Sequence, residues 1–340
     1  MRAHDRCFAA LCLLALACGS GGETSGSDTT GGDTPTSSAG PSTSNPSTSA
    51  GSTASTTTAA DVTTADASSG DAESSPTSAD ESSSASSGTT GEEGRDYGSD
   101  RTQFFGDPRC DVPDLLLCDS FEDGALDTDV WQPNGDVSID SAKGARGSGS
   151  LHVHAEQNGW SAVHETVTFP APNNTYFGRM FVWIDAVPIA PDWSHWTLVG
   201  AAGSGDSSEI RVGGQFNPFA GMNLFGIGTD GGPTGDWTNL DDDPPGAPMA
   251  VVVQDWVCIE WMHDGANDET RFWWDAVEHP SLATTPDVEH GGIPDAQYVM
   301  PEFESVWVGW WLYQGGPTPD HYDVWIDEVA IDAIRIGCIY

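Results

Sequence analysis

Basic side chains are scarce in this chain of 340 residues: 11 lysines and arginines stand against 52 aspartates and glutamates, and the formal net charge is −41. A protein that holds nucleic acid must neutralise phosphates with basic side chains, so the composition excludes a nucleic-acid partner of that kind. It also disfavours a strongly anionic polysaccharide, because an acidic domain repels such a polymer over a Debye length of about 8 Å at physiological salt.

The sequence also lacks an N-terminal apolar run long enough to cross a membrane. The run from Cys7 to Cys18 has 12 residues, whereas a spanning helix needs about 20. Arg2 and Arg6 precede it, and small residues end it, which is typical of a secretory signal peptide. The segment resembles a bacterial lipoprotein signal. We therefore expect residues 1–17 to be removed and Cys18 to be lipidated, so that lipid alone anchors the secreted protein to the outer membrane or cell surface; plain secretion is the alternative.

Aromatic residues are absent from Gly19 to Asp96, and Val62 is the only branched aliphatic residue of that stretch. Serine, threonine, glycine, alanine and acidic residues make up most of the rest, and such a composition cannot build a core. We expect residues 18–100 to be a disordered tether and residues 101–340 to form one domain.

All 14 tryptophans lie in that C-terminal part, where apolar residues recur at every second position. This period predicts β-strands separated by turns rich in glycine, proline, asparagine and aspartate, and no segment has the pattern of an amphipathic helix. The expected fold is an all-β, two-sheet antiparallel sandwich of jelly-roll type, with a groove on the outer face of one curved sheet. The strands are expected at residues 176–184, 209–216, 251–262, 270–274, 306–313 and 322–331.

Alternation assigns two of these strands to faces. In 306–313, the interior positions are Val306, Val308, Trp310 and Leu312, and the outward positions are Trp307, Trp311 and Tyr313. In 209–216, a polar face holds Glu209, Arg211 and Gln215. Aromatic rings on an open sheet face offer a platform for sugar rings.

Cysteines are few, and no two of them have the C-x-x-C spacing of a zinc site. If Cys18 carries lipid, four remain for two disulfides in an oxidising compartment, and three connectivities are open. We favour Cys110 with Cys118, which closes a short loop, and Cys258 with Cys338, which joins the last strand to the domain.

Four motifs in order carry a resemblance to a known family: residues 118–124, 144–153, 176–183 and 324–331. Together they resemble the core of the fungal cellulose-induced protein family and its bacterial relatives, which is similar to glucuronan lyases among the concanavalin-like jelly rolls. The resemblance covers roughly residues 104–340.

The resemblance implies a structural calcium ion held by the side chains of Glu122 and Asp327 and by the carbonyls of Arg146 and Gly149. Calcium prefers six to eight such hard oxygens. The alternative is that both acids are solvated residues at strand ends.

The resemblance also implies β-elimination on a uronate. Arg211 and Gln215 would neutralise the substrate carboxylate, while His195, Tyr322 or His321 would supply the base and the acid. Glu209 stands where the lyase relatives carry a histidine, and a simple Arg211–Glu209 ion pair is the alternative. The residues expected to bind substrate are Glu209, Arg179, Trp307, Trp311 and Tyr313.

Other enzyme classes lack their signatures. A Glu-x-Asp-x-x-Glu strand, a Gly-x-Ser-x-Gly elbow, a phosphate-binding loop and a His-Glu-x-x-His helix do not occur. Two hypotheses remain: a surface-tethered polysaccharide lyase, and a non-catalytic carbohydrate-binding module of the same fold. Both imply a polysaccharide partner, and we expect a monomer.

Overall fold

The computed structural model of the chain describes residues 94–111, 115–189, 192–205, 209–230, 237–239, 250–285, 299–312 and 319–340. The signal peptide, Cys18, nearly all of the tether and Tyr313 lie outside these residues, so the predictions made for them stay predictions. Within the described residues, no helix combines the length and the apolar character that crossing a bilayer requires.

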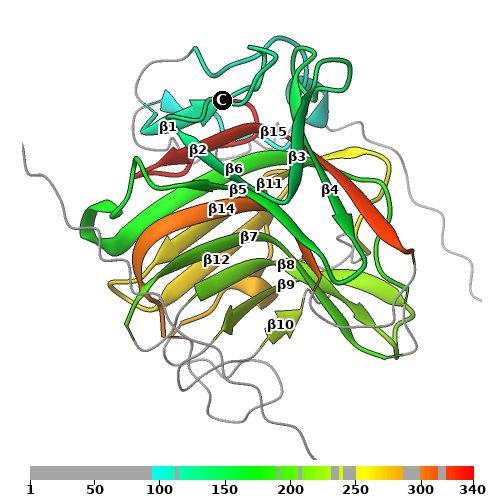
Figure 1. Ribbon diagram of the computed structural model, residues 1–340. Helices are drawn as coiled ribbons and strands as arrows, with labels where there is room; N and C mark the ends of the chain where they lie inside the picture. Colours follow the sequence, from blue (N-terminus) through cyan, green and yellow to red (C-terminus); the bar gives the residue numbers. More distant parts are fainter. Residues whose placement is uncertain are drawn as a thin grey trace, which may run out of the picture. The chain divides into compact units, whose positions relative to one another are not determined.

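Two antiparallel sheets pack face to face (Figure 1), which confirms the predicted all-β sandwich. The eight-stranded sheet has the order β13-β12-β11-β6-β15-β4-β3, with β1 paired to β15. Its strands are β13 (Val277–Glu278), β12 (Glu269–Trp274), β11 (Trp256–Asp264), β6 (Thr175–Ile184), β15 (His321–Asp332), β4 (Ser150–Glu156), β3 (Asp136–Asp140) and β1 (Leu117–Asp119).

The seven-stranded sheet has the order β10-β9-β8-β7-β14-β5-β2. Its strands are β10 (Trp237–Asn239), β9 (Met222–Asp230), β8 (Glu209–Asn217), β7 (Ser194–Ser204), β14 (Glu302–Leu312), β5 (Trp160–Glu165) and β2 (Trp131–Asn134). The described residues also include three short 3-10 helices, of which η2 (Arg101–Gln103) precedes β1, and η3 (Pro172–Asn174) and η4 (Pro280–Leu282) lie between strands.

The core lies between the sheets and follows the predicted alternation. All four inward positions of β14 belong to the main hydrophobic cluster. The ring of Trp310 stacks on Trp196 of β7 at 5.1 Å and on Tyr322 of β15 at 4.9 Å between ring centroids. This stack joins the two sheets, because β7 and β14 belong to one sheet and β15 to the other. Aromatic stacking therefore helps to fix how the sheets pack.

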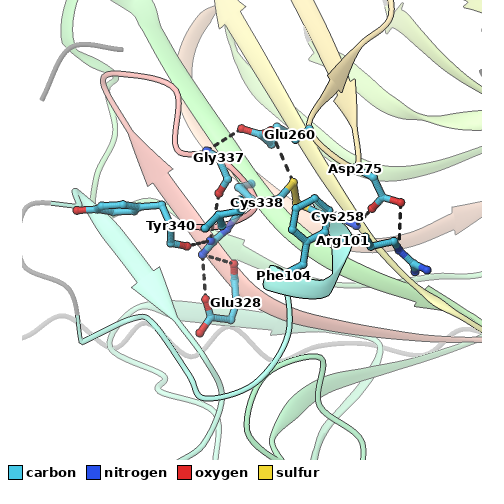
Figure 2. Close-up of a disulfide and its surroundings, with 12 residues drawn as sticks. Arg101, Phe104, Cys258, Glu260, Asp275, Glu328, Gly337, Cys338 and Tyr340 are labelled. Carbon is cyan, nitrogen blue, oxygen red and sulfur yellow. Dashed lines mark hydrogen bonds and ion pairs between the residues drawn. A yellow bond between two sulfur atoms is a disulfide. The ribbon is translucent and has the colours of Figure 1, made fainter. Parts of the chain in front are cut away.

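The chain segments before β1 and after β15 cover the outer face of the eight-stranded sheet. Phe104 is fully buried there beside the disulfide between Cys258 and Cys338, whose surroundings Figure 2 shows. The second predicted disulfide, between Cys110 and Cys118, is also present, so both pairings are confirmed.

The domain begins earlier than the predicted boundary at residue 101. Arg95 is only 7% exposed and forms an ion pair with Asp332. Tyr97 donates its hydroxyl hydrogen to the carbonyl oxygen of Arg335 at 3.0 Å. Composition alone does not reveal this earlier start, because Arg95 and Tyr97 stand in a stretch of otherwise small and polar residues.

Candidate functional site

The outer face of the seven-stranded sheet carries a group of aromatic and charged side chains, which we call the aromatic face. It consists of Trp160 on β5, Trp307 and Trp311 on β14, and Glu209 and Arg211 on β8. The ring of Trp160 lies 5.9 Å from that of Trp307 and 5.7 Å from that of Trp311. The predicted outward orientation of the two β14 tryptophans is therefore confirmed.

Glycine makes room for the indole of Trp307. Gly200 on β7 pairs with Trp307 of β14 on one side and with Arg211 of β8 on the other. A Cβ atom at Gly200 would overlap the indole of Trp307 and the carboxylate of Glu209. The ring therefore lies across the backbone of β7 and reaches β8.

The charges of this face are paired within the protein. Arg211 Nε contacts Glu209 Oε2 at 2.5 Å, and Trp307 Nε1 donates to Glu209 Oε1 at 2.5 Å. The guanidinium of Arg211 also lies 4.2 Å above the ring of Trp311. The side chains of Arg211 and Glu209 are only 7% and 12% exposed. The Arg211–Glu209 ion pair, which the sequence analysis gave as an alternative, is thus present, and in it the charges of the two side chains balance each other.

Gln215 and His195 lie further along the same face. They are directly opposite each other in the pairing of β7 with β8, and Gln215 is 3% exposed. His195 contacts Trp237 with 5.2 Å between ring centroids. Four positions of a strand separate Arg211 from Gln215, or roughly 13 Å between Cα atoms at the usual rise. The face therefore brings the arginine, the glutamine and one histidine together on one side of the sheet.

Two predicted site residues lie elsewhere. Tyr322, a candidate catalytic residue, points into the core of the sandwich and stacks on Trp310, and burial raises its pKa to about 12. Arg179, a candidate for substrate binding, lies on the other sheet, 1% exposed, and donates to Glu328 Oε2 at 3.0 Å. Both predictions were wrong for the same reason: alternation gives the side of a strand and says nothing about which sheet the strand joins. His321, named as an alternative acid or base, also lies on the eight-stranded sheet.

Sequence reasoning missed Trp160 and His164, which are both on β5. Trp160 is 40% exposed, and its ring meets that of His164 at 5.4 Å. Burial lowers the pKa of His164, and the nearby carboxylate of Glu209 opposes this shift. Little in the sequence marks these two residues, because apolar and polar side chains do not alternate in Trp-Ser-Ala-Val-His-Glu at positions 160–165.

The loop between β3 and β4 contains two of the predicted calcium ligands, Arg146 and Gly149, and is hydrogen-bonded to the other two, Glu122 and Asp327. Glu122 Oε1 accepts hydrogen bonds from the amides of Ser148 and Gly149, both at 2.7 Å. Asp327 Oδ2 accepts from the amides of Ala145 and Arg146 at 2.8 and 2.9 Å. Burial raises the pKa of Asp327 to about 7, although the hydrogen bond from the backbone amide of Arg146 acts in the opposite direction. Both carboxylates therefore fasten this loop.

The donor groups at this loop are of the kinds that calcium binds. A Cβ atom at Gly144 would lie 2.8 Å from the carbonyl oxygen of Arg146 and 2.9 Å from that of Gly149, so these two oxygens lie close to one point. A carboxylate offers about four lone-pair positions, and those of Glu122 and Asp327 are not all used by the hydrogen bonds of the loop. Hard oxygens of these two kinds are the usual ligands of calcium, and water commonly completes the set.

Comparison with known proteins gives structural matches only, because no family model and no curated protein matches the sequence. One solved structure that resembles the chain is the cellulose-induced protein Cip1, with a TM-score of 0.51, 22% identity, and coverage of 65% of this chain and 99% of that one. Another is an endo-β-1,4-glucuronan lyase from the fungus Trichoderma reesei, with a TM-score of 0.41, 13% identity, and coverage of 65% and 96%. The likeness to Cip1 shows a common fold, which is the jelly roll that the sequence predicted.

Proposed function

We propose that this protein binds a polysaccharide on the aromatic face of its seven-stranded sheet. The observation that carries this proposal is the 40% exposure of Trp160 beside the rings of Trp307 and Trp311. A large aromatic side chain that is exposed within a group of other aromatic rings is unusual on a protein surface and marks a candidate binding site. Sugar rings present C–H groups that pack on aromatic faces, so the group is suited to a glycan chain.

The chemistry of the face favours a neutral or sparsely charged glycan. Arg211 already binds Glu209 through Nε and is stacked on Trp311, so a sugar carboxylate would have to share this guanidinium with an existing ion pair. A hexose without a carboxylate meets no such competition. We therefore assign to Arg211 the task of holding in place Glu209 and Trp311, whose ring lies beside the exposed ring of Trp160.

Affinity electrophoresis in gels that contain single plant or microbial glycans tests this proposal. Trp160→Ala should lower the apparent affinity for the glycan, measured from the retardation, at least tenfold. Its thermal unfolding should be almost the same as that of the parent. Trp183→Ala, which removes a half-buried tryptophan from the other sheet, is the matched control and should bind as the parent does. Equal losses in the two variants, or no glycan that retards the parent, would contradict the proposal.

β-Elimination on a uronate-containing glycan is the second candidate. It is favoured by the placement of Arg211, Gln215 and His195 on one face of adjacent strands. A base on this face could remove the C5 proton while the amide and the guanidinium bind the carboxylate; the C4–O bond would then break, and the leaving oxygen would take a proton from the protonated base or from water. In this reaction the guanidinium of Arg211 would bind the substrate carboxylate beside Glu209, which already occupies its Nε.

The ultraviolet absorbance of unsaturated products, measured over a panel of uronate-containing glycans, tests this reaction. The parent should form product, and His195→Ala should form none while it keeps binding the glycan. Binding by the parent without any product would refute the lyase and leave the binding proposal intact.

We further propose that calcium binds at the loop between β3 and β4, with Glu122, Asp327 and the carbonyls of Arg146 and Gly149 as ligands. The ion would supply positive charge to two carboxylates that already fasten this loop to β15 and to the segment after β1. Its role would be structural, since the loop lies on the sheet opposite to the aromatic face.

A further inference from the structure

Three of the nine histidines of the chain gather on the outer face of the eight-stranded sheet. His152 and His154 lie on β4, and His321 lies on the neighbouring strand β15. In the pairing of these strands, Asp323 is directly opposite His154, and His321 is opposite Glu156. We call His152, His154, His321 and Asp323 the histidine patch. It lies on the sheet that does not carry the aromatic face.

Asp323 is the centre of this patch. Its Oδ1 contacts His152 Nε2 at 2.8 Å and His154 Nδ1 at 3.0 Å, and its Oδ2 lies 3.8 Å from His321 Nε2. The three imidazole side chains are 27%, 30% and 57% exposed, and that of Asp323 is 22% exposed. An ion from solution can therefore reach all four groups.

The surroundings of the patch are acidic. Asp136 on β3 is opposite His154, and Glu156 Oε1 lies 3.7 Å from His154 Nε2. One ammonium group near the patch is that of Lys143, whose Nζ lies 3.2 Å from the centroid of the Trp325 ring and interacts with the charge of Asp323. Carboxylates therefore outnumber ammonium groups around the imidazoles.

One imidazole is held in place from behind. The ring of His152 stacks on that of Trp325 at 4.6 Å with 15° between planes, and Trp325 Nε1 donates to Asp140 Oδ2 at 2.9 Å. This stacking restricts how the ring of His152 can turn.

We propose that the histidine patch is a binding site for a divalent transition-metal ion of the zinc or copper class. Imidazole nitrogens with a carboxylate oxygen are the donor set that these ions prefer, whereas calcium and magnesium prefer oxygen alone. His152, His154 and Asp323 supply three ligands, and His321 is exposed enough to turn and supply a fourth. In the arrangement described, Asp323 Oδ1 accepts from both β4 imidazoles and the four groups do not yet converge on one point, so binding requires the rings to turn and exchange their hydrogen bonds to Asp323 for the ion.

Calorimetric titration of the tag-free chain with zinc chloride tests this site. The titration is carried out in an excess of magnesium, which occupies the many carboxylates of this acidic protein and does not compete for imidazole. The parent should show one saturable zinc site. His154→Gln and His152→Gln should each weaken it at least tenfold, and His164→Gln, which changes a half-buried histidine of the other sheet, should leave it unchanged. A parent without saturable binding, or equal affinity in parent and His154→Gln, would overturn the proposal.

Electron paramagnetic resonance with one equivalent of Cu²⁺ gives an independent readout. Nitrogen hyperfine structure should be present in the parent and simpler in the His152→Gln variant. A spectrum of oxygen ligation alone in the parent would also overturn the proposal. Circular dichroism of His152→Gln and His154→Gln should match that of the parent. The loss of metal binding can then be assigned to the missing imidazole and not to a change in the fold.

Discussion

His263 makes the stability of this protein sensitive to acid. It lies on β11, fully buried, with its ring 5.8 Å from that of Phe303 and 5.5 Å from that of Tyr176. Its Nδ1 is 3.0 Å from Thr270 Oγ1, and its Nε2 has no hydrogen-bond partner among the residues that the structure describes. Burial lowers the pKa of His263 to about 3, although a hydrogen bond with the backbone of Met262 acts the other way. The imidazole is therefore neutral in the folded protein at any physiological pH.

The sign of the effect follows from the protons bound in each state. Below its ordinary pKa of about 6.5, the imidazole takes up a proton in the unfolded chain and stays neutral in the folded one. Acid therefore favours unfolding between about pH 6.5 and pH 3, by about 1.4 kcal/mol for each pH unit. At pH 4 the loss from this one residue should be roughly 3 kcal/mol relative to pH 7.

Urea unfolding, followed by tryptophan fluorescence at several pH values, measures this loss. His263→Asn removes the titration and keeps a polar atom for Thr270. The variant should be less stable than the parent at pH 7, because the smaller side chain leaves a cavity. Between pH 7 and pH 4 it should lose roughly 3 kcal/mol less than the parent does. The carboxylates titrate alike in both proteins and cancel in this difference. Identical pH slopes for parent and variant would refute the reasoning.

Three further outcomes are expected. Replacing Cys258 and Cys338 by alanine should cost about 4.5 kcal/mol, and replacing Cys110 and Cys118 about 2.5 kcal/mol, because the first bond closes a loop of 80 residues and the second a loop of 8; denaturant unfolding of the two double variants should show this order, and the reverse order would contradict it. Glu209→Gln should cost about 3 kcal/mol by leaving a buried guanidinium without its carboxylate, whereas an unchanged urea midpoint would show that the pair contributes nothing. Calcium at about 100 times its dissociation constant should stabilise the chain by about 3 kcal/mol over a chelator-treated sample, and superimposable unfolding curves would argue against the calcium site.

The sequence was sufficient for the features that depend on local alternation. The period of two correctly placed Trp310 inside and Trp307 and Trp311 outside, because a strand with one buried face forces that division. Both disulfides could be inferred because only four cysteines follow residue 100 and one pair is close in sequence.

Other features depend on how distant segments meet, and local pattern could not supply them. Asp327 and Glu328 lie at an irregularity of β15 where the pairing with β6 shifts, and Glu328 has a φ of 50°. The irregularity lets both neighbouring acids reach polar partners outside the core, against strict alternation. Arg179 finds Glu328 only because β6 and β15 are adjacent in the sheet. Neither the irregularity nor the adjacency has a signature in the residues concerned.

The arginines bear on which glycan this protein can take. Each arginine that the structure describes donates to an oxygen of the protein itself. They are Arg95, Arg101, Arg109, Arg146, Arg179, Arg211, Arg271 and Arg335. A polyuronate needs guanidinium groups that are available for its carboxylates, and here it would compete with internal partners while approaching a chain of net charge −41. A neutral glycan faces neither cost and gains the contact with Trp160. Charge and side-chain pairing therefore both rank a neutral glycan above a polyuronate as the occupant of the aromatic face.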